Sequence, residues 1–542
     1  MKLKLIEKFR RFQMHSFLKN NVFSISFGTS LSKFAGCIRQ IFIAAAFGVG
    51  VTYDAFNYAY IIPGFLLIII GGINGPLHNA VVAVLTPLNK KNGGIVLTQV
   101  SIKLSILLII LAILIYSNSS LLIDLLAPNL SYEAKSIATY QLQILTPCIP
   151  LSGFIGLSFG ALNSQRKFFL SSISPAITSV TIIFFILFSW IFNQENTSSN
   201  FFTYTGLLAF ATLTGTLIQF VVQIWEINKI GLLRLESTFN LFKDEERRIF
   251  KLIIPASISS GLSQINVFID MFFASSFQGA ASGLAYGNFL IQAPLGILSN
   301  SLILPLLPKF SKLRNEKDKR GLQKKLISGV EYCFLTAIFL TGFFITFNNQ
   351  IVQLVFQRGS FDYSATLKVK NILIAYAVGI PFYLYRDLLV RTYYSIEKTN
   401  FPFKSSFAGI IFNIFFDWFL IGAPIKNFGN LFPYNFGVVG IILSSVIVNL
   451  IVCILLSFNL RNEDIHLPNF DLLRKISLMS LAVFVDSTLC FTILQTTNNF
   501  NSNLAEFLLL IFGTLTFFVI YFLLTKCLKV NKFKVSKKRF SF

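Results

Sequence analysis

Residues 408–423 read AGIIFNIFFDWFLIGA, a segment that is almost entirely apolar apart from Asn413 and Asp417. A carboxylate placed at the centre of a membrane costs about 2.5–3.5 kcal/mol on insertion scales. Asn413 precedes Asp417 by four residues, so both side chains project from one face of a helix. The pair therefore indicates either a polar contact that holds helices together or a binding site.

The rest of the chain has the composition of a membrane protein. Its 542 residues are 54% hydrophobic and 13% charged, about half of the charged share of a soluble domain. Long apolar runs, rather than short alternating ones, predict a polytopic all-α fold and exclude a β-barrel. About fourteen transmembrane helices are expected, centred near residues 35, 70, 107, 150, 180, 215, 262, 297, 338, 380, 413, 447, 483 and 515.

The net charge of +23 lies mainly in alternate connecting segments. Such alternation reports membrane orientation and contact with anionic membrane lipids rather than nucleic acid. It predicts an even number of spans with both termini in the cytoplasm, a cytoplasmic tail at 1–20 and a basic tail at 528–542. The basic segments between the tails lie at 89–92, 164–168, 243–251, 309–325, 397–404 and 460–475.

Residues that carry out metal or acid–base chemistry are sparse. The six cysteines are scattered without a CxxC motif, and the three histidines are far apart in the sequence. No disulfide framework is implied. Because no nucleophile or acid–base constellation is visible, we do not expect an enzyme.

An internal repeat divides the chain. AAFGVGVTYDAFNYAYIIPGFL (45–66) corresponds to SSFQGAASGLAYGNFLIQAPLGIL (275–298), an offset of about 230 residues that 160–172 and 391–403 share. A parallel repeat of this length predicts two six-helix lobes with a substrate cavity between them. The lobes would span 21–230 and 231–460, and two further helices would occupy 461–527.

Four stretches of the chain resemble the MurJ/MviN family of lipid II flippases, which belongs to the multidrug/oligosaccharidyl-lipid/polysaccharide exporter superfamily. They lie at 32–65, 160–176, 261–312 and 356–404. The segment GFLLIIIGGINGPLHNA (64–80) is most similar to the cyanobacterial branch.

The resemblance implies a specific function and location. A bacterial inner-membrane protein would move an undecaprenyl-linked peptidoglycan precursor from the inner to the outer leaflet by alternating access, for cell-wall synthesis. Residues 461–527 would form a groove for the lipid tail, and wall-synthesis enzymes would be partners.

Two cations in the first helix are candidate substrate ligands. Arg39 and Lys33 match cationic positions of the family, and a guanidinium binds phosphate through paired hydrogen bonds. The alternative is that Lys33 reaches the membrane surface and Arg39 pairs internally, for example with Asp54. Polar groups expected to complete the site are Asn57, Asn74, Asn288 and Gln292.

Asp54 opens the second helix, where the family also carries an acid. An outer gate and plain capping of the helix dipole are equally compatible with its position. Further along this helix, Pro63 and the glycines around Gly72 predict a bent or partly unwound span.

The cavity departs from the family pattern at four positions. Ile61, Ile68 and Phe289 stand where basic residues are usual, and Gly72 stands where an acid is usual. The expected cavity is therefore less cationic than in the family.

The pair in the opening segment is a candidate cation site. Carboxylate, amide and hydroxyl oxygens together suit a hard cation. The resemblance implies a sodium ion held by Asp270, Asn413 and Asp417, with Ser445 as a weaker match. A protonated aspartate that clasps the asparagine, and a proton-coupled role, remain the alternatives.

A last charged cluster lies near the end of the tenth helix. Arg386, Asp387 and Arg391 are expected to form local interfacial salt bridges. Beyond the flippase, the alternatives are a flippase for another polysaccharide-lipid, a drug/sodium antiporter, and a non-transporting scaffold for wall synthesis.

Overall fold

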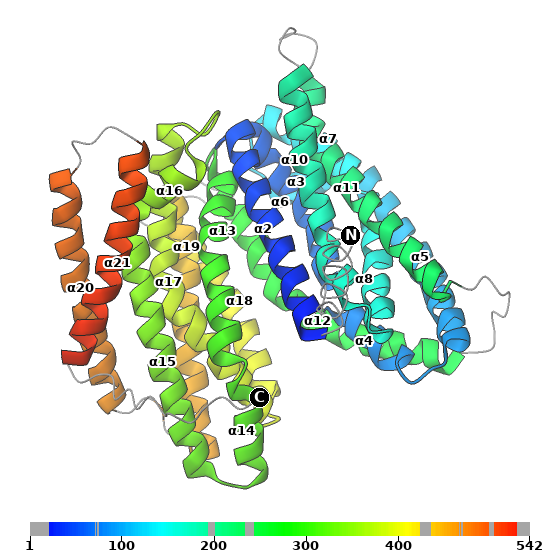
Figure 1. Ribbon diagram of the computed structural model, residues 1–542. Coiled ribbons are helices and arrows are strands. Elements are labelled where there is room, and N and C mark those ends of the chain that lie inside the picture. Colours follow the sequence, from blue (N-terminus) through cyan, green and yellow to red (C-terminus); the bar gives the residue numbers. More distant parts are fainter. Residues whose placement is uncertain are drawn as a thin grey trace, which may run out of the picture. The chain divides into compact units, whose positions relative to one another are not determined.

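The computed structural model of the protein is built from α-helices, and the residues that it describes include no strand (Figure 1). The described residues are 21–70, 72, 75–192, 201–233, 243–422, 435–465, 467, 470–497 and 503–527. Three sequence predictions, the tail at 1–20, the tail at 528–542 and the ligand Asn74, lie outside these ranges.

The chain forms two compact units. The first contains the residues up to Ser282 together with Arg358–Phe361. Its helices are α2 (Asn21–Phe47), α3 (Val51–Ile69), α4 (Pro76–Leu85), α5 (Lys90–Ser117), α6 (Ser119–Leu126), α7 (Tyr132–Leu145), α8 (Cys148–Ser164), α9 (Phe168–Ile173), α10 (Pro175–Phe192), α11 (Phe201–Ile230) and α12 (Lys243–Ala274).

The second unit contains Gly283–Gln357 and the residues from Asp362 onward. α13 (Ala280–Leu298) begins in the first unit and continues into the second. The other helices are a π-helix (Ser299–Ile303), α14 (Leu306–Asn315), α15 (Lys319–Thr346), α16 (Asn348–Phe356), α17 (Tyr363–Ser395), α18 (Asn400–Ile421), α19 (Gly437–Asn459), a 3₁₀-helix (Leu460–Glu463), α20 (Phe470–Thr497) and α21 (Asn503–Cys527).

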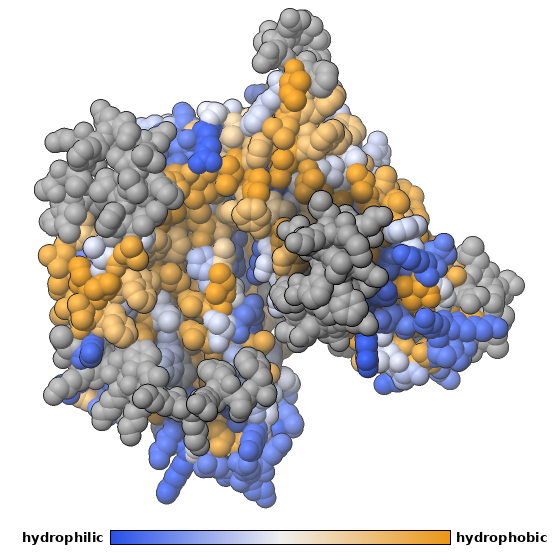
Figure 2. All heavy atoms as spheres, viewed as in Figure 1, coloured by the Kyte–Doolittle hydropathy of each residue, from blue (hydrophilic) through white to orange (hydrophobic). Residues whose placement is uncertain are grey.

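The prediction of an all-α polytopic membrane protein is confirmed. Within the described ranges, eight helices are long and apolar enough to cross a membrane, and α7 with α8, bent by 44°, gives a ninth. Large apolar side chains are exposed along these helices, for example Ile110 on α5 and Phe412 on α18. Figure 2 shows such hydrophobic surface beside hydrophilic ends. The count of fourteen spans stays a prediction.

Several helices begin at a side chain that accepts a backbone N–H from the first turn. Asn89 caps α5, Ser131 caps α7, and Asp318 and Asp362 cap α15 and α17, with acceptor distances of 2.8–3.3 Å. Such caps satisfy donors that the helix itself leaves unpaired. The polar residues between the apolar runs therefore define where the helices start.

The second predicted span is broken, as the sequence indicated. α3 ends at Ile69 and α4 begins at Pro76, while Pro63 lies inside α3. Gly75 N donates to Gly72 O in the turn between them, 3.0 Å. A Cβ on Gly72 would lie 2.8 Å from Ile68 O, so the acid that is usual in the family at this position would require this turn to shift.

The sequence repeat has a counterpart in local structure. Pro294 lies inside α13 as Pro63 lies inside α3. α13 then passes into the π-helix at Ser299, so both helices lose regular α geometry shortly after the proline. The compact units divide after Ser282 and place α12 with the first unit, whereas the lobe boundary at 230/231 is defined by the repeat and stays a prediction.

Candidate functional site

Arg39 is a cation with unsatisfied hydrogen-bonding capacity. It lies on α2, half-buried, and its Nε is buried without a hydrogen-bond partner. Within the part of the chain that the structure describes it has no ion pair. Its charge interacts electrostatically with the hydroxyls of Tyr53 and Tyr60. A buried N–H without a partner is costly, so the binding of an anion by Arg39 stays a prediction that this geometry allows. Lys33, six residues earlier on the same helix, is exposed.

Polar and aromatic groups of α3 lie next to Arg39. Gln40 Nε2 donates to Tyr53 Oη at 2.7 Å, which ties α2 to α3. Asn57 Nδ2 donates to the Tyr53 carbonyl at 2.7 Å, so this predicted ligand turns back onto its own helix. The Tyr53, Phe56 and Tyr60 rings stack in sequence, with centroids 6.2 and 5.6 Å apart.

Asp54 caps a helix that is distant in sequence. The carboxylate is 3% exposed and accepts hydrogen bonds from Gly279 N, from Ser282 N at 2.8 Å and from the Ser282 hydroxyl. These donors lie at the start of α13, where the helix dipole favours a negative charge. Asp54 and Arg39 form no ion pair, so the internal pairing considered for Arg39 is not seen. The gate assignment of Asp54 stays a prediction.

A second contact lies at the end of α2. Ser360 N donates to Ala45 O at 2.8 Å. Gly48 and Gly359 both have positive φ, 54° and 55°. A Cβ on Gly359 would lie 2.3 Å from Ala45 O, and one on Gly48 would lie 2.2 Å from Ser360 O. Only glycine fits these two positions.

The predicted ligands of the second unit lie on one face of α13. Asn288 and Gln292, four residues apart, are both exposed. Phe289 between them contacts the Phe356 ring, with centroids 6.4 Å apart. Phe289 stands where the family usually has an arginine, and it adds an aromatic contact at this position.

Three of the four predicted cation ligands come together. Asn413 Nδ2 donates to Asp417 Oδ2 at 2.8 Å, and Ser445 Oγ donates to Asn413 Oδ1 at 3.4 Å. Asp417 is fully buried and Asn413 is 1% exposed. Asp270 is half-buried and belongs to the other unit. The carboxylate, amide and hydroxyl oxygens of these three residues are of the kind that a hard cation prefers. No cluster of three His, Cys, Asp or Glu occurs in the described ranges.

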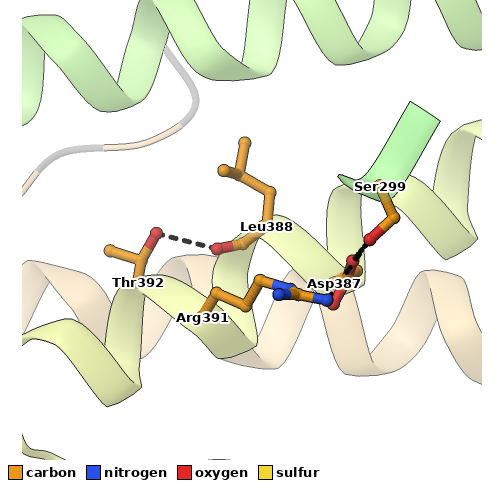
Figure 3. A network of polar contacts seen from close by, with 5 residues as sticks. All are labelled: Ser299, Asp387, Leu388, Arg391 and Thr392. Atoms are coloured by element: carbon orange, nitrogen blue, oxygen red, sulfur yellow. Dashed lines mark hydrogen bonds and ion pairs between the residues drawn. The ribbon is translucent and has the colours of Figure 1, made fainter. Parts of the chain in front are cut away.

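The charged cluster of α17 is partly as predicted (Figure 3). Arg391 Nε pairs with Asp387 Oδ1 at 2.8 Å, and Asp387 also accepts from the Ser299 hydroxyl. Arg386 is not in this ion pair; it donates to Asn449 Oδ1 at 2.9 Å and to Ser406 Oγ at 3.5 Å. Ser299 was missed because sequence patterns do not indicate the π-helix that carries it.

Comparisons with known proteins agree with this architecture. A family model described as "Lipid II flippase MurJ" matches residues 43–514. The chain is 39% identical over 428 residues to a probable lipid II flippase MurJ of Synechocystis sp., covering 79% of this chain and 78% of that protein. It is 25% identical over 528 residues to the Thermotoga maritima protein of the same description, covering 97% and 99%.

Solved structures of related transporters share this fold. The structure of lipid II flippase MurJ in an inward closed conformation matches with a TM-score of 0.73 at 25% identity, covering 93% of this chain and 98% of that chain. An inward-facing multidrug resistance MATE family transporter of the MOP superfamily matches with a TM-score of 0.57 at 15% identity, covering 80% and 94%. The fold and its buried polar groups thus define a polytopic helical transporter.

Within this class the family is clear. The chain belongs to the lipid II flippase MurJ family, and the resemblance to its cyanobacterial branch is confirmed.

Proposed function

We propose that this protein is a lipid II flippase, which moves an undecaprenyl-linked peptidoglycan precursor from the inner to the outer leaflet of the bacterial inner membrane. The observation that carries the proposal is Arg39, a half-buried guanidinium whose Nε has no partner. Such a group suits the pyrophosphate of a lipid-linked sugar. Lys33, Asn57, Asn74, Asn288 and Gln292 would contact the rest of the headgroup. The function is transport and includes no catalytic step.

The lipid tail requires an apolar surface. α20 and α21 expose large apolar side chains, among them Phe484 at 70% and Phe518 at 57%. This surface supports a tail-binding role for residues 461–527. The headgroup would cross by alternating access, with Asp54 at the outer gate and both termini in the cytoplasm. Wall-synthesis enzymes would receive the product as partners.

A sodium ion at Asp417, Asn413 and Ser445, with Asp270 as a fourth ligand, would couple transport to the ion gradient. One monovalent ion that moves down a membrane potential supplies about 2.3 kcal/mol per 100 mV. Support comes from the oxygen-only donor set and from the complete burial of Asp417. Protons and a purely structural clasp are the competing explanations.

Complementation tests the proposal in cells. Bacteria depleted of their own lipid II flippase would receive the wild type, Arg39→Ala or Asp417→Ala at equal expression. We expect the wild type to restore growth and Arg39→Ala to fail, while Asp417→Ala reports whether the ion site is needed. An expressed wild type that does not restore growth would contradict the proposed substrate.

A further inference from the structure

A series of hydrogen bonds joins Asp417 to Arg386 inside the second unit. Arg386 Nη1 donates to Asn449 Oδ1 at 2.9 Å, and Asn449 Nδ2 donates to the Ser445 carbonyl at 2.6 Å. Ser445 Oγ then donates to Asn413 Oδ1 at 3.4 Å, and Asn413 Nδ2 donates to Asp417 at 2.8 Å. Every donor lies on the side of the guanidinium and every acceptor on the side of the carboxylate, so the dipoles of the series share one direction.

The guanidinium at the start of this series has no ion-pair partner in the part of the chain that the structure describes. Arg386 forms no ion pair within the described ranges; its two partners are the neutral Asn449 and Ser406. Arg391, five residues later on the same helix, pairs with Asp387. Of the two arginines of α17, Arg386 is therefore the one whose positive charge is not held in an ion pair.

The electrostatic effect of Arg386 on the cation ligands depends on the distance between them. Ser406, beside the guanidinium, precedes Asp417 by eleven residues, and Asn449 follows Ser445 by one helical turn. At about 1.5 Å of rise per residue, the guanidinium therefore lies, along the helix axes, about 6 Å from Ser445, about 10 Å from Asn413 and about 16 Å from Asp417. The middle of the ligand set is about 11 Å away. At an effective dielectric constant of about 20, one charge at that distance changes the affinity of a monovalent cation about tenfold.

We propose that Arg386 serves as the resident counter-charge of Asp417 and competes with the transported ion, which lowers the affinity of the site for that ion. The inference rests on the cation site of the proposed function. A transporter must release its ion, and a fully buried carboxylate that loses a bound cation is costly. The guanidinium offsets part of that cost when the ion leaves, and it lowers ion affinity so that release is feasible.

Trp418 provides a reporter next to Asp417, since the chain has three tryptophans and the others, at 190 and 225, can be replaced by phenylalanine. In this background we would titrate Na⁺ against choline at constant ionic strength and record Trp418 fluorescence. We expect Arg386→Gln to tighten Na⁺ binding about tenfold and Arg386→Lys to leave it within about twofold. Asp417→Asn should abolish the response.

A matched control removes one positive and one negative charge, so the net charge stays the same. Asp387→Asn combined with Arg391→Gln deletes the neighbouring ion pair and should leave the Na⁺ affinity unchanged. Asn449→Asp provides an independent test if Arg386→Gln does not fold, because a carboxylate 2.9 Å from the guanidinium neutralises it in place. It too should tighten Na⁺ binding.

The outcomes separate the claims. Damage to the helix packing would weaken binding, whereas the loss of a competing charge strengthens it, so the direction of the change is decisive. Unchanged or weaker binding in Arg386→Gln, or in Asn449→Asp where the former does not fold, would overturn the role of Arg386 and leave the cation site standing. A saturable response in neither the wild type nor Arg386→Gln would overturn the site and the inference together, without bearing on the flippase.

Discussion

Replacing Asp54 should release the start of α13. The carboxylate accepts two backbone N–H groups and one hydroxyl in a site where it is 3% exposed. A buried N–H that loses its partner costs about 1–3 kcal/mol, and a lost N-cap costs about 0.5–2 kcal/mol. We therefore expect Asp54→Ala to destabilise this contact by about 2–4 kcal/mol. Asp54→Asn should cost less, because its amide retains one acceptor oxygen.

Hydrogen exchange of a peptide that covers residues 277–285 measures this effect. Local opening that is easier by about 2 kcal/mol accelerates amide exchange about thirtyfold at 25 °C. Arg39→Gln is the matched control: because Arg39 and Asp54 form no ion pair, it should leave exchange at α13 unchanged. Unchanged exchange in both Asp54 variants, or acceleration by Arg39→Gln, would refute the capping role and restore an Arg39–Asp54 gate.

Two further predictions concern helix ends and turns. Gly359→Ala should lower stability by about 1–3 kcal/mol, since the new Cβ meets Ala45 O at 2.3 Å and φ is 55°. Gly36→Ala, where a Cβ meets nothing within 4 Å, should cost nothing or stabilise α2 by up to about 1 kcal/mol; equal melting temperatures for the two variants in detergent would contradict this. Asp362→Ala should cost about 1 kcal/mol at pH 7 through loss of the α17 N-cap. Hydrogen bonds from the Ala365 backbone and the Ser364 hydroxyl hold the pKa of Asp362 below its usual value, so its contribution is complete above the unfolded pKa of about 3.9 and falls as the pH drops through the folded pKa. The difference between wild type and variant should therefore shrink in melting curves recorded between pH 5 and pH 3; a constant difference would argue against the cap.

The sequence predicted the helical class, the broken second span and the contact of Asn413 with Asp417, because each depends on local pattern or helical spacing. It did not predict that Asp54 caps α13, since the partners lie 225 residues apart and capping leaves no periodic signal. In the charged cluster of α17, one contact was predictable from the sequence and another was not. Arg391 and Asp387 are four residues apart and pair as spacing suggests, whereas Arg386 turns to α18 and α19, a choice that depends on tertiary packing.

The central claim is that Arg39 holds the headgroup of a lipid-linked precursor during transport. The most direct test measures how fast lipid II becomes accessible to a membrane-impermeant reagent in proteoliposomes that carry the wild type, Arg39→Lys or Arg39→Ala. A hydrogen bond to a charged group contributes about 1.5–3 kcal/mol, so Arg39→Ala should slow movement by about tenfold or more, with Arg39→Lys between it and the wild type. Full speed in Arg39→Ala, or no lipid II movement by the wild type under any ion gradient, would contradict the account.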